Sequence, residues 1–136
     1  MIVADASLMT AWLISETDVA VGQDVYDTLA ENTLLVPAHW PVEIGNALGV
    51  NLRRGRITAE LIDAIESRLK EFVIVMAPPV PPAEMASLVH VAARQRLTIY
   101  DACYVQLAWQ NRATLATLDG DMWAAAQRLS IDVLPA

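Results

Sequence analysis

The chain has 136 residues, of which 55% are hydrophobic, and its formal net charge is −7 at pH 7. This length and apolar content are typical of one globular domain, so we expect a single domain over residues 1–136. The negative charge argues against a protein that holds nucleic acid through a general positive field, so any such contact has to be local or mediated by a metal ion.

Short, β-branched apolar runs alternate with longer segments of helical period, which is typical of βαβ units around a mainly parallel sheet. Strands are predicted at Ile2–Ala4, Thr33–Val36, Phe72–Met76, Ala113–Thr117 and Ile131–Leu134. Helices are predicted at 7–14, 19–31, 41–54, 58–71, 83–95, 102–111 and 122–129. The expected fold class is therefore α/β, with a small five-stranded sheet flanked by about seven helices.

The sequence contains no signal for a membrane. No stretch approaches the roughly 18 apolar residues that a membrane helix needs, and the first residues lack the basic segment of a signal peptide. We therefore expect a cytoplasmic protein without a membrane partner. The single cysteine, Cys103, cannot form an internal disulfide and is expected to be a small buried hydrophobe.

Four acidic residues lie where the chain enters helices. Asp5 follows the first predicted strand, Asp119 follows the fourth, and Glu43 lies two residues after Pro41. Asp101 is predicted to open a helix that follows a strand. Each acid alone is explained by helix capping or by the helix dipole, because a carboxylate accepts the unsatisfied amide hydrogens of a first helical turn.

Further polar residues accompany these acids. Ser7 is a second candidate cap after the first strand, and at the last helix either Asp119 or Asp121 can be the cap, which leaves the other unused. Asn46, three residues after Glu43, is predicted to share its face in a helix that otherwise looks buried. A buried polar pair needs a partner, so these two residues are candidates for a site.

The four acids indicate more as a set than singly. Ligands of parallel sheets bind beyond the carboxyl ends of the strands, so Asp5 and Asp119 should lie side by side if their strands are neighbours, and Glu43 and Asp101 can then close a ring. Carboxylates at close range raise one another's pKa unless a counter-charge is present. Mg²⁺ or Mn²⁺ supplies that charge, prefers oxygen ligands and binds phosphate, which suits phosphodiester cleavage.

Other chemistries have little support. His39 and His90 are far apart in the sequence and lack zinc-ligand spacing. The chain has neither a Gly-x-Gly-x-x-Gly nor a Gly-Lys-Ser/Thr motif, which argues against nucleotide cofactors. A nucleophilic Ser7 or Cys103 has no evident histidine and acid beside it.

Four segments, in this order, resemble the PIN-domain family and, within it, the VapC-type toxins of prokaryotic toxin–antitoxin pairs. The segments are Val3-Ala4-Asp5-Ala6-Ser7, Pro41-Val42-Glu43-Ile44-Gly45-Asn46-Ala47-Leu48, Tyr100-Asp101-Ala102 and Leu115-Ala116-Thr117-Leu118-Asp119. The match covers essentially the whole chain. It implies a single PIN domain with a three-layer α/β/α fold, and an endoribonuclease that hydrolyses RNA phosphodiester bonds with Mg²⁺ or Mn²⁺ as cofactor.

The resemblance also assigns roles to the four acids. Asp5, Asp101 and Asp119 are expected to be metal ligands, and Glu43 is expected to position or activate the attacking water. Asp121 is the competitor of Asp119 for the fourth acidic position.

Supporting roles go to three neighbours of the acids and to two basic residues. Ser7 and Thr117 are expected to hydrogen-bond the carboxylates or a phosphate oxygen, and Asn46 to orient the Glu43 side chain. Arg53 and Arg54 are candidates to contact RNA phosphates, with charge compensation at a helix end as the structural alternative.

The partners implied by the resemblance are an RNA substrate, a second copy of the chain in a homodimer, and a cognate antitoxin protein whose chain crosses the acidic site. The competing hypothesis is a catalytically inactive PIN-like scaffold that only binds a partner protein. That hypothesis predicts that losing one acid leaves every function of the protein intact.

Overall fold

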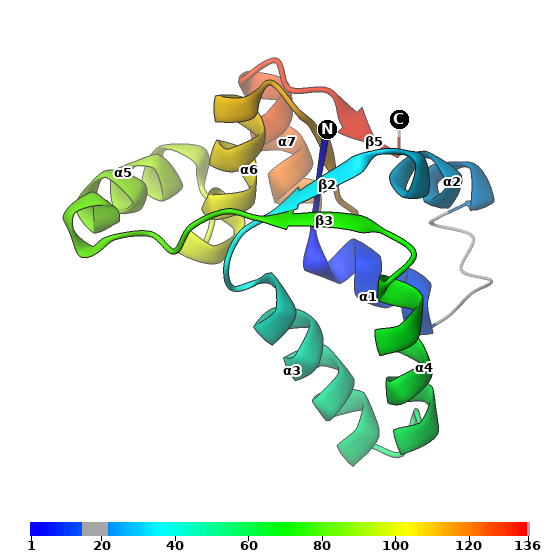
Figure 1. Ribbon diagram of the computed structural model, residues 1–136. Helices are drawn as coiled ribbons and strands as arrows, with labels where there is room; N and C mark the ends of the chain where they lie inside the picture. The colour runs from blue at the N-terminus through cyan, green and yellow to red at the C-terminus, as the bar shows by residue number, and fades with distance from the viewer. Residues whose placement is uncertain (15–21, 136) are drawn as a thin grey trace.

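The sheet contains five parallel strands. The computed structural model describes residues 1–14 and 22–135, and in this part of the chain each pair of neighbouring strands is parallel (Figure 1). The strands are β1 (Ile2–Ala4), β2 (Thr33–Val36), β3 (Val73–Met76), β4 (Thr114–Ala116) and β5 (Val133–Leu134). Each strand lies within its predicted segment, and the differences are confined to the strand ends.

The seven predicted helices are all present. They are α1 (Ala6–Ile14), α2 (Gln23–Glu31), α3 (Trp40–Arg53), α4 (Ala59–Leu69), α5 (Met85–Gln95), α6 (Ile99–Asn111) and α7 (Gly120–Arg128), and a 3₁₀ turn (Pro82–Glu84) precedes α5. Residues 19–21, the predicted start of the second helix, lie outside the described residues. Within those residues, no helix is long and apolar enough to cross a membrane.

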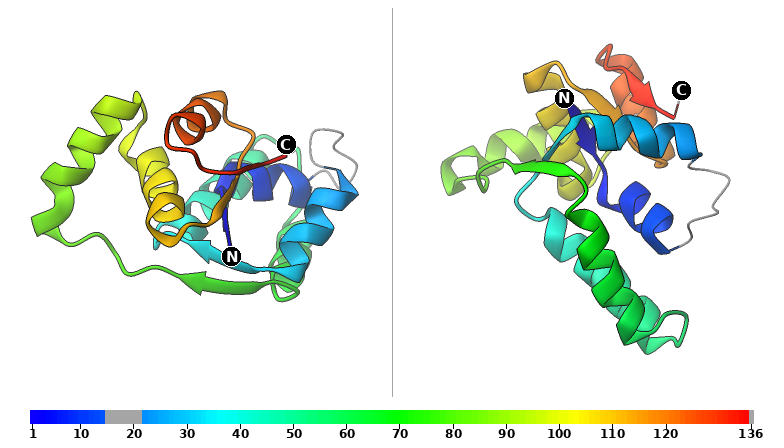
Figure 2. Two further views of the ribbon diagram at one scale, coloured as in Figure 1. Left: turned by 90° about the horizontal axis from the view of Figure 1, so that it is seen from above. Right: turned by 45° about the vertical axis from the view of Figure 1, so that its right-hand side comes forward.

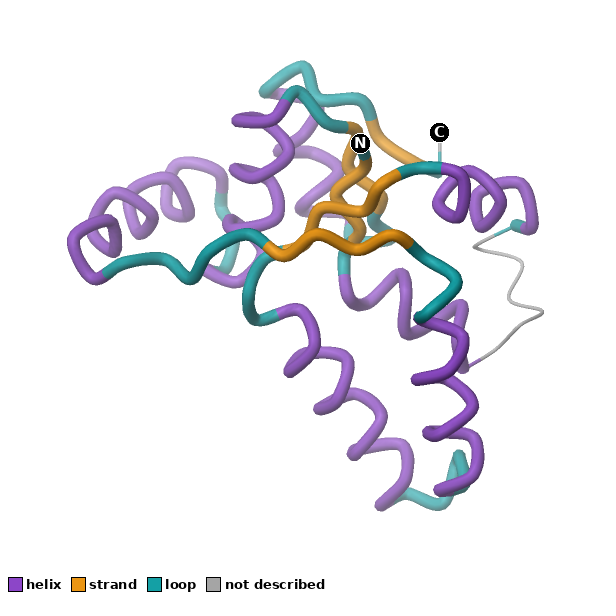
Figure 3. Tube along the Cα trace, in the orientation of Figure 1, coloured by secondary structure: helices purple, strands orange, loops and turns teal. Residues whose placement is uncertain are grey.

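The strand order across the sheet is β3-β2-β1-β4-β5. The chain therefore runs outward from β1 to β3 and then returns to build β4 and β5 on the other side of β1. Because parallel crossovers are right-handed, this reversal places the helices of the two halves on opposite faces of the sheet. Figures 1 and 3 show α1, α3 and α4 below the sheet and α6 and α7 above it, which confirms the expected three-layer α/β/α arrangement.

The centre of the sheet is fully buried. Val3 and Ala4 of β1 and Leu115 and Ala116 of β4 are each 0% exposed. Strands covered by helices on both faces are apolar at successive positions, which explains why β1 is a continuous apolar run and why β4 is apolar at Leu115 and Ala116. The strand order reverses between these two strands, so their carboxyl ends lie next to each other at one edge of the buried sheet.

Candidate acidic site at the carboxyl edge of the sheet

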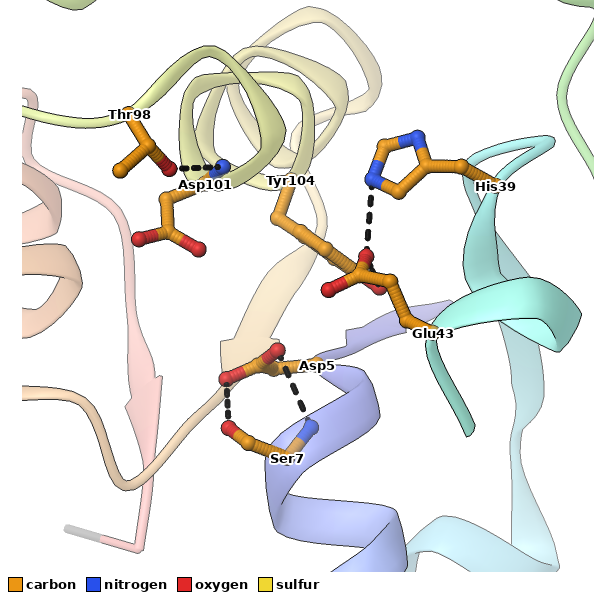
Figure 4. Close-up of polar contacts among 7 residues, drawn as sticks. All are labelled: Asp5, Ser7, His39, Glu43, Thr98, Asp101 and Tyr104. Carbon is orange, nitrogen blue, oxygen red and sulfur yellow. Dashed lines mark hydrogen bonds and ion pairs between the residues drawn. The ribbon is translucent and has the colours of Figure 1, made fainter. Parts of the chain in front are cut away.

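Asp5 lies directly after β1 and is 3% exposed. Its amide donates a hydrogen bond of 2.9 Å to the carbonyl of Ala116, which ties it to the neighbouring strand β4. Its Oδ2 atom accepts hydrogen bonds from the hydroxyls of Ser7 (2.6 Å; Figure 4) and Thr117 (2.9 Å). The Ser7 amide also approaches Oδ1 at 3.3 Å, so Asp5 caps α1 as well. Asp5 can therefore cap α1 and also belong to the site. Its buried carboxylate has the hydrogen-bond partners that burial requires.

Asp119 is the cap of α7. Its Oδ1 atom accepts a hydrogen bond of 2.8 Å from the amide of Met122, and its own amide donates to the Thr117 hydroxyl at 3.0 Å. Asp121 lies in the first turn of α7 and is exposed. Of the two acids that the sequence left open, Asp119 is therefore the cap, and it is also the one connected through Thr117 to Asp5.

Two expectations about Asp101 are wrong. The helix that contains it, α6, follows helix α5 and not a strand, and it begins at Ile99. Thr98 is the cap, because its hydroxyl accepts the amide hydrogen of Asp101 at 3.1 Å. Thr98 and Asp101 have the spacing of a capping box, a signal in the sequence that identifies this cap. The Asp101 carboxylate is consequently not used as the cap of its own helix.

The charges of the other three acids act on Asp101. The pKa of the Asp101 carboxyl is raised, first by burial and then by the negative charges of Asp119, Asp5 and Glu43, while a hydrogen bond with Thr98 opposes the shift. Figure 4 shows the carboxylates of Asp5, Glu43 and Asp101 directed into the space between α6, α3 and the end of β1. The fold therefore gathers the predicted acids at one edge of the sheet.

Glu43, in the first turn of α3, is held by two residues outside the set predicted from the sequence. The Tyr104 hydroxyl donates a hydrogen bond of 2.8 Å to Oε1 of Glu43, and Nε2 of His39 lies 2.9 Å from the same oxygen. The His39 contact is close, but its ring N–H is not aligned as a hydrogen bond. Burial, the hydrogen bond to Glu43 and the charge of Glu43 raise the pKa of Tyr104, so its hydroxyl stays protonated and donates.

The sequence does contain signals for both residues. His39 precedes Glu43 by four positions at the start of the same helix, and Tyr104 follows Asp101 by three positions in α6. Residues three or four positions apart share a helix face, so the spacing places His39 beside Glu43 and Tyr104 beside Asp101. The contact between Tyr104 of α6 and Glu43 of α3, by contrast, is a tertiary contact.

Asn46 has a different environment from the one expected. It is exposed, as is Val42 on the same helix at 73%, so the predicted buried polar pair with Glu43 is wrong. An amide in contact with water needs no protein partner. Among the described residues, the contacts of Glu43 come from Tyr104 and His39, and no hydrogen bond joins it to Asn46.

Arg53 and Arg54 are not brought to the acids. Both are exposed at the far end of α3, whereas Glu43 lies in its first turn. Ten residues of helix separate Glu43 from Arg53 by about 15 Å along the axis. Figure 2 shows the α3–α4 pair projecting from the sheet, which carries the end of α3 away from the site.

The donor atoms at this edge suit a hard divalent cation. Asp5, Glu43, Asp101 and Asp119 offer carboxylate oxygens, the ligands that Mg²⁺ and Mn²⁺ prefer. Within the described residues, no three His, Cys, Asp or Glu side chains are close enough to ligate one ion as they stand. The set thus fits such an ion chemically, and direct ligation by three carboxylates would require side-chain movement.

A groove of about 720 Å³ borders the acids through His39. Its walls include Ala38 and Leu107, together with Cys103, which is partly buried and not the fully buried residue expected. His39, which contacts Glu43, therefore connects the acids to an open groove.

No protein-family model matches the chain. Ribonuclease VapC3 of Mycobacterium tuberculosis, from strains CDC 1551 / Oshkosh and ATCC 25618 / H37Rv, is 32% identical over 120 residues, which are 87% of this chain and 82% of that protein. PAE2754 from Pyrobaculum aerophilum has a TM-score of 0.71 at 24% identity, covering 98% of this chain and 83% of that one. FitAcB from Neisseria gonorrhoeae has a TM-score of 0.58 at 20% identity, covering 98% and 96%. The two solved structures are similar to this chain in fold.

Proposed function

This chain belongs to the VapC ribonuclease family and has a PIN-like fold, and we propose on that basis that it is a metal-dependent endoribonuclease, the toxin of a toxin–antitoxin pair. We take residues 1–136 as a single PIN domain. The observation that carries the proposal is the gathering of Asp5, Glu43, Asp101 and Asp119 where the strand order reverses between β1 and β4. Open α/β sheets bind their ligands at this reversal.

Asp5, Asp101 and Asp119 are the residues that would hold Mg²⁺ or Mn²⁺. Burial first, and then the charges of Asp119, Asp5 and Glu43, raise the pKa of the Asp101 carboxyl, and a bound cation would offset the repulsion among these charges. When bound, such an ion polarises a phosphoryl oxygen and lowers the pKa of a bound water. Ser7 and Thr117 would keep the Asp5 carboxylate in one orientation, since both donate to its Oδ2 atom.

Glu43 would position or activate the attacking water. Its Oε1 atom is in contact with Tyr104 and His39, whereas these contacts do not use Oε2. A carboxylate with one oxygen held and the other available can orient a water molecule toward a phosphate. The contacts of Glu43, which differ from those of the proposed metal ligands, support this division of roles.

RNA, an antitoxin and a second copy of the chain are the proposed partners. The net charge of −7 suits a metal-mediated contact with RNA and a basic segment of an antitoxin. The relative VapC3 is named a ribonuclease, which supports RNA as the substrate. Large exposed apolar side chains on β3 and α5, among them Val73 (61%) and Met85 (61%), would be covered in a homodimer.

The test is cleavage of total cellular RNA by the purified chain in Mg²⁺ or Mn²⁺, with a chelator and the Asp101→Asn variant in parallel. We expect fragments that need the metal and that disappear in both controls, while Asp63→Asn, on the exposed side of α4, still cleaves. The scaffold alternative predicts no cleavage in any metal and no cation binding by calorimetry. That pair of results would refute the nuclease proposal.

A further inference from the structure

The hydroxyl of Tyr104 is aimed from the core of the protein at the edge of the acidic site. Tyr104 is 0% exposed, and its side chain reaches from α6 to Glu43 on α3, 61 residues away in the sequence. The 2.8 Å hydrogen bond joins helices that lie on opposite faces of the sheet. A buried phenol needs a partner for its O–H group, and here that partner is one oxygen of Glu43 (Figure 4).

His39 approaches the same oxygen from another direction. Its ring packs edge-on against Tyr104 and against Tyr100, in each case with ring centroids 5.5 Å apart, and its Nε2 atom lies 2.9 Å from Oε1 of Glu43. The two aromatic contacts restrict the orientation of the imidazole ring. Glu43 therefore has one oxygen in contact with two restrained side chains, although it lies at the partly exposed start of a helix.

We propose that Tyr104 is a positioning residue for Glu43, holding its carboxylate in the orientation in which the second oxygen can act on the substrate side of the site. This inference rests on the proposed nuclease function. In this role Tyr104 acts through Glu43 and not by contact with the RNA or the metal ion. His39 supports the same orientation as a secondary contact, since its Nε2 atom contacts the same Oε1 atom of Glu43 from the partly exposed side.

The pKa of Tyr104 supports a permanent donor. Burial is the main cause of its upward shift, followed by the hydrogen bond to Glu43 and the charge of Glu43. The hydroxyl is therefore protonated at neutral pH and donates to Glu43. A glutamate without such a donor would sample several rotamers. A reacting group that is slightly misplaced lowers the rate of the chemical step more than it lowers the affinity for the substrate.

The chain offers a matched control for this contact. Tyr26 also donates its hydroxyl to a carboxylate, that of Glu71, at 2.7 Å, and burial with this hydrogen bond raises the pKa of Tyr26 to about 12. Its ring is stacked on Trp12 with centroids 3.7 Å apart, and the pair lies outside the acidic site. Replacement of either tyrosine by phenylalanine removes one hydroxyl and keeps the ring.

The experiment measures kcat, KM and the unfolding midpoint for wild type, Tyr104→Phe and Tyr26→Phe, on an RNA oligonucleotide that the wild type cleaves. We expect Tyr104→Phe to lose about tenfold in kcat, with KM within about twofold of wild type. Tyr26→Phe should keep both constants within about twofold, because its hydroxyl contacts no acid of the site. Equal kcat values for Tyr104→Phe and wild type would overturn the inference.

A double-mutant cycle separates positioning from a structural effect. Glu43→Gln should lose more kcat than Tyr104→Phe, and adding Tyr104→Phe to Glu43→Gln should cost less than about twofold further, because the two residues act through one group. If the kcat losses of the two single variants multiply in full in the double variant, Tyr104 does not work through Glu43, and the proposal is refuted.

Two outcomes keep the inference distinct from the proposed function. A wild type without metal-dependent cleavage contradicts the nuclease function itself, whereas an active wild type with a fully active Tyr104→Phe contradicts the positioning role alone. If Tyr104→Phe does not fold, His39→Asn tests the same oxygen from the partly exposed side. It should lose kcat with little further loss in the Glu43→Gln background, and unchanged kcat would overturn the inference.

Discussion

The hydroxyl of Thr117 donates a 2.9 Å hydrogen bond to the Asp5 carboxylate, although 112 positions separate the two residues in the sequence. The contact exists because β1 and β4 are neighbours in the sheet and end at the same edge. Thr117 also accepts the amide hydrogen of Asp119 at 3.0 Å, so one buried hydroxyl connects two of the four acids. The consequences of this arrangement can be measured.

Removing the Thr117 hydroxyl should reduce the stability of the protein. Thr117→Val keeps the shape of the side chain but leaves the 3%-exposed Asp5 carboxylate with one donor fewer, at a cost of about 1–3 kcal/mol in the free energy of unfolding. Urea denaturation measures that loss. The control is Thr10→Val, because the buried Thr10 hydroxyl has no hydrogen-bond partner among the described residues and its removal should not destabilise the protein. Equal losses in the two variants would contradict the role of the Asp5 contact.

Asp119 and Asp121, the two aspartates at the start of α7, should differ in their effect on cleavage. Asp119→Asn should keep the helix cap, since asparagine caps about as well as aspartate, with unfolding free energy within about 0.5 kcal/mol of wild type. Its cleavage rate should nevertheless fall by about tenfold or more, because a charged oxygen is lost from the site. Asp121→Asn, at an exposed position, is expected to cleave like wild type. A larger loss of rate in Asp121→Asn would reverse the assignment.

Stability without metal should depend on pH through Asp101. The folded-state pKa of this carboxyl is raised, so its favourable contribution is complete below the ordinary aspartate pKa of 3.8 and is lost as pH rises through the folded value. In chelator, Asp101→Asn should therefore have a higher urea midpoint than wild type at neutral pH, and the difference should shrink in acid. Asp63→Asn, exposed on α4, serves as the control and should show no comparable gain. A neutral-pH midpoint of Asp101→Asn at or below that of wild type would contradict the prediction.

Divalent cations should stabilise the wild type more than Asp101→Asn. A cation that binds only the folded state at 100 times its Kd adds about 2.7 kcal/mol to the free energy of unfolding. Thermal unfolding in increasing Mn²⁺, with samples without added metal and samples with chelator alongside, measures this gain. Parallel increases in the two proteins would indicate that the ion binds elsewhere.

Arg53 and Arg54 should be dispensable for the chemical step. Both lie at the exposed end of α3, about 15 Å along the helix from Glu43, so the double change to glutamine should leave kcat on a short oligonucleotide within about twofold of wild type. Binding of long RNA at low salt is the companion measurement, since phosphate contacts are salt-dependent. A tenfold loss of kcat on the short substrate would show that the arginines reach the site.

The sequence by itself predicted the secondary structure and the candidate set of acids. The seven helices and five strands have local signatures in hydrophobic period and β-branched content, which do not depend on distant residues. Asp5 and Asp119 each follow a strand, and this position marks the ligand-binding edge of a parallel sheet. The cap of α6 at Thr98 also has a local signal, its capping-box spacing to Asp101, although we expected Asp101 to open this helix.

Only the tertiary structure decided which elements meet. The adjacency of β1 and β4, the Tyr104 contact to Glu43 and the exposure of Asn46 all depend on how helices cover the sheet. Hydrophobic periodicity identifies the apolar face of an element, but it does not identify the element that covers this face. The partners of each acid were therefore decided by strand order and helix packing, which bring together residues far apart in the chain.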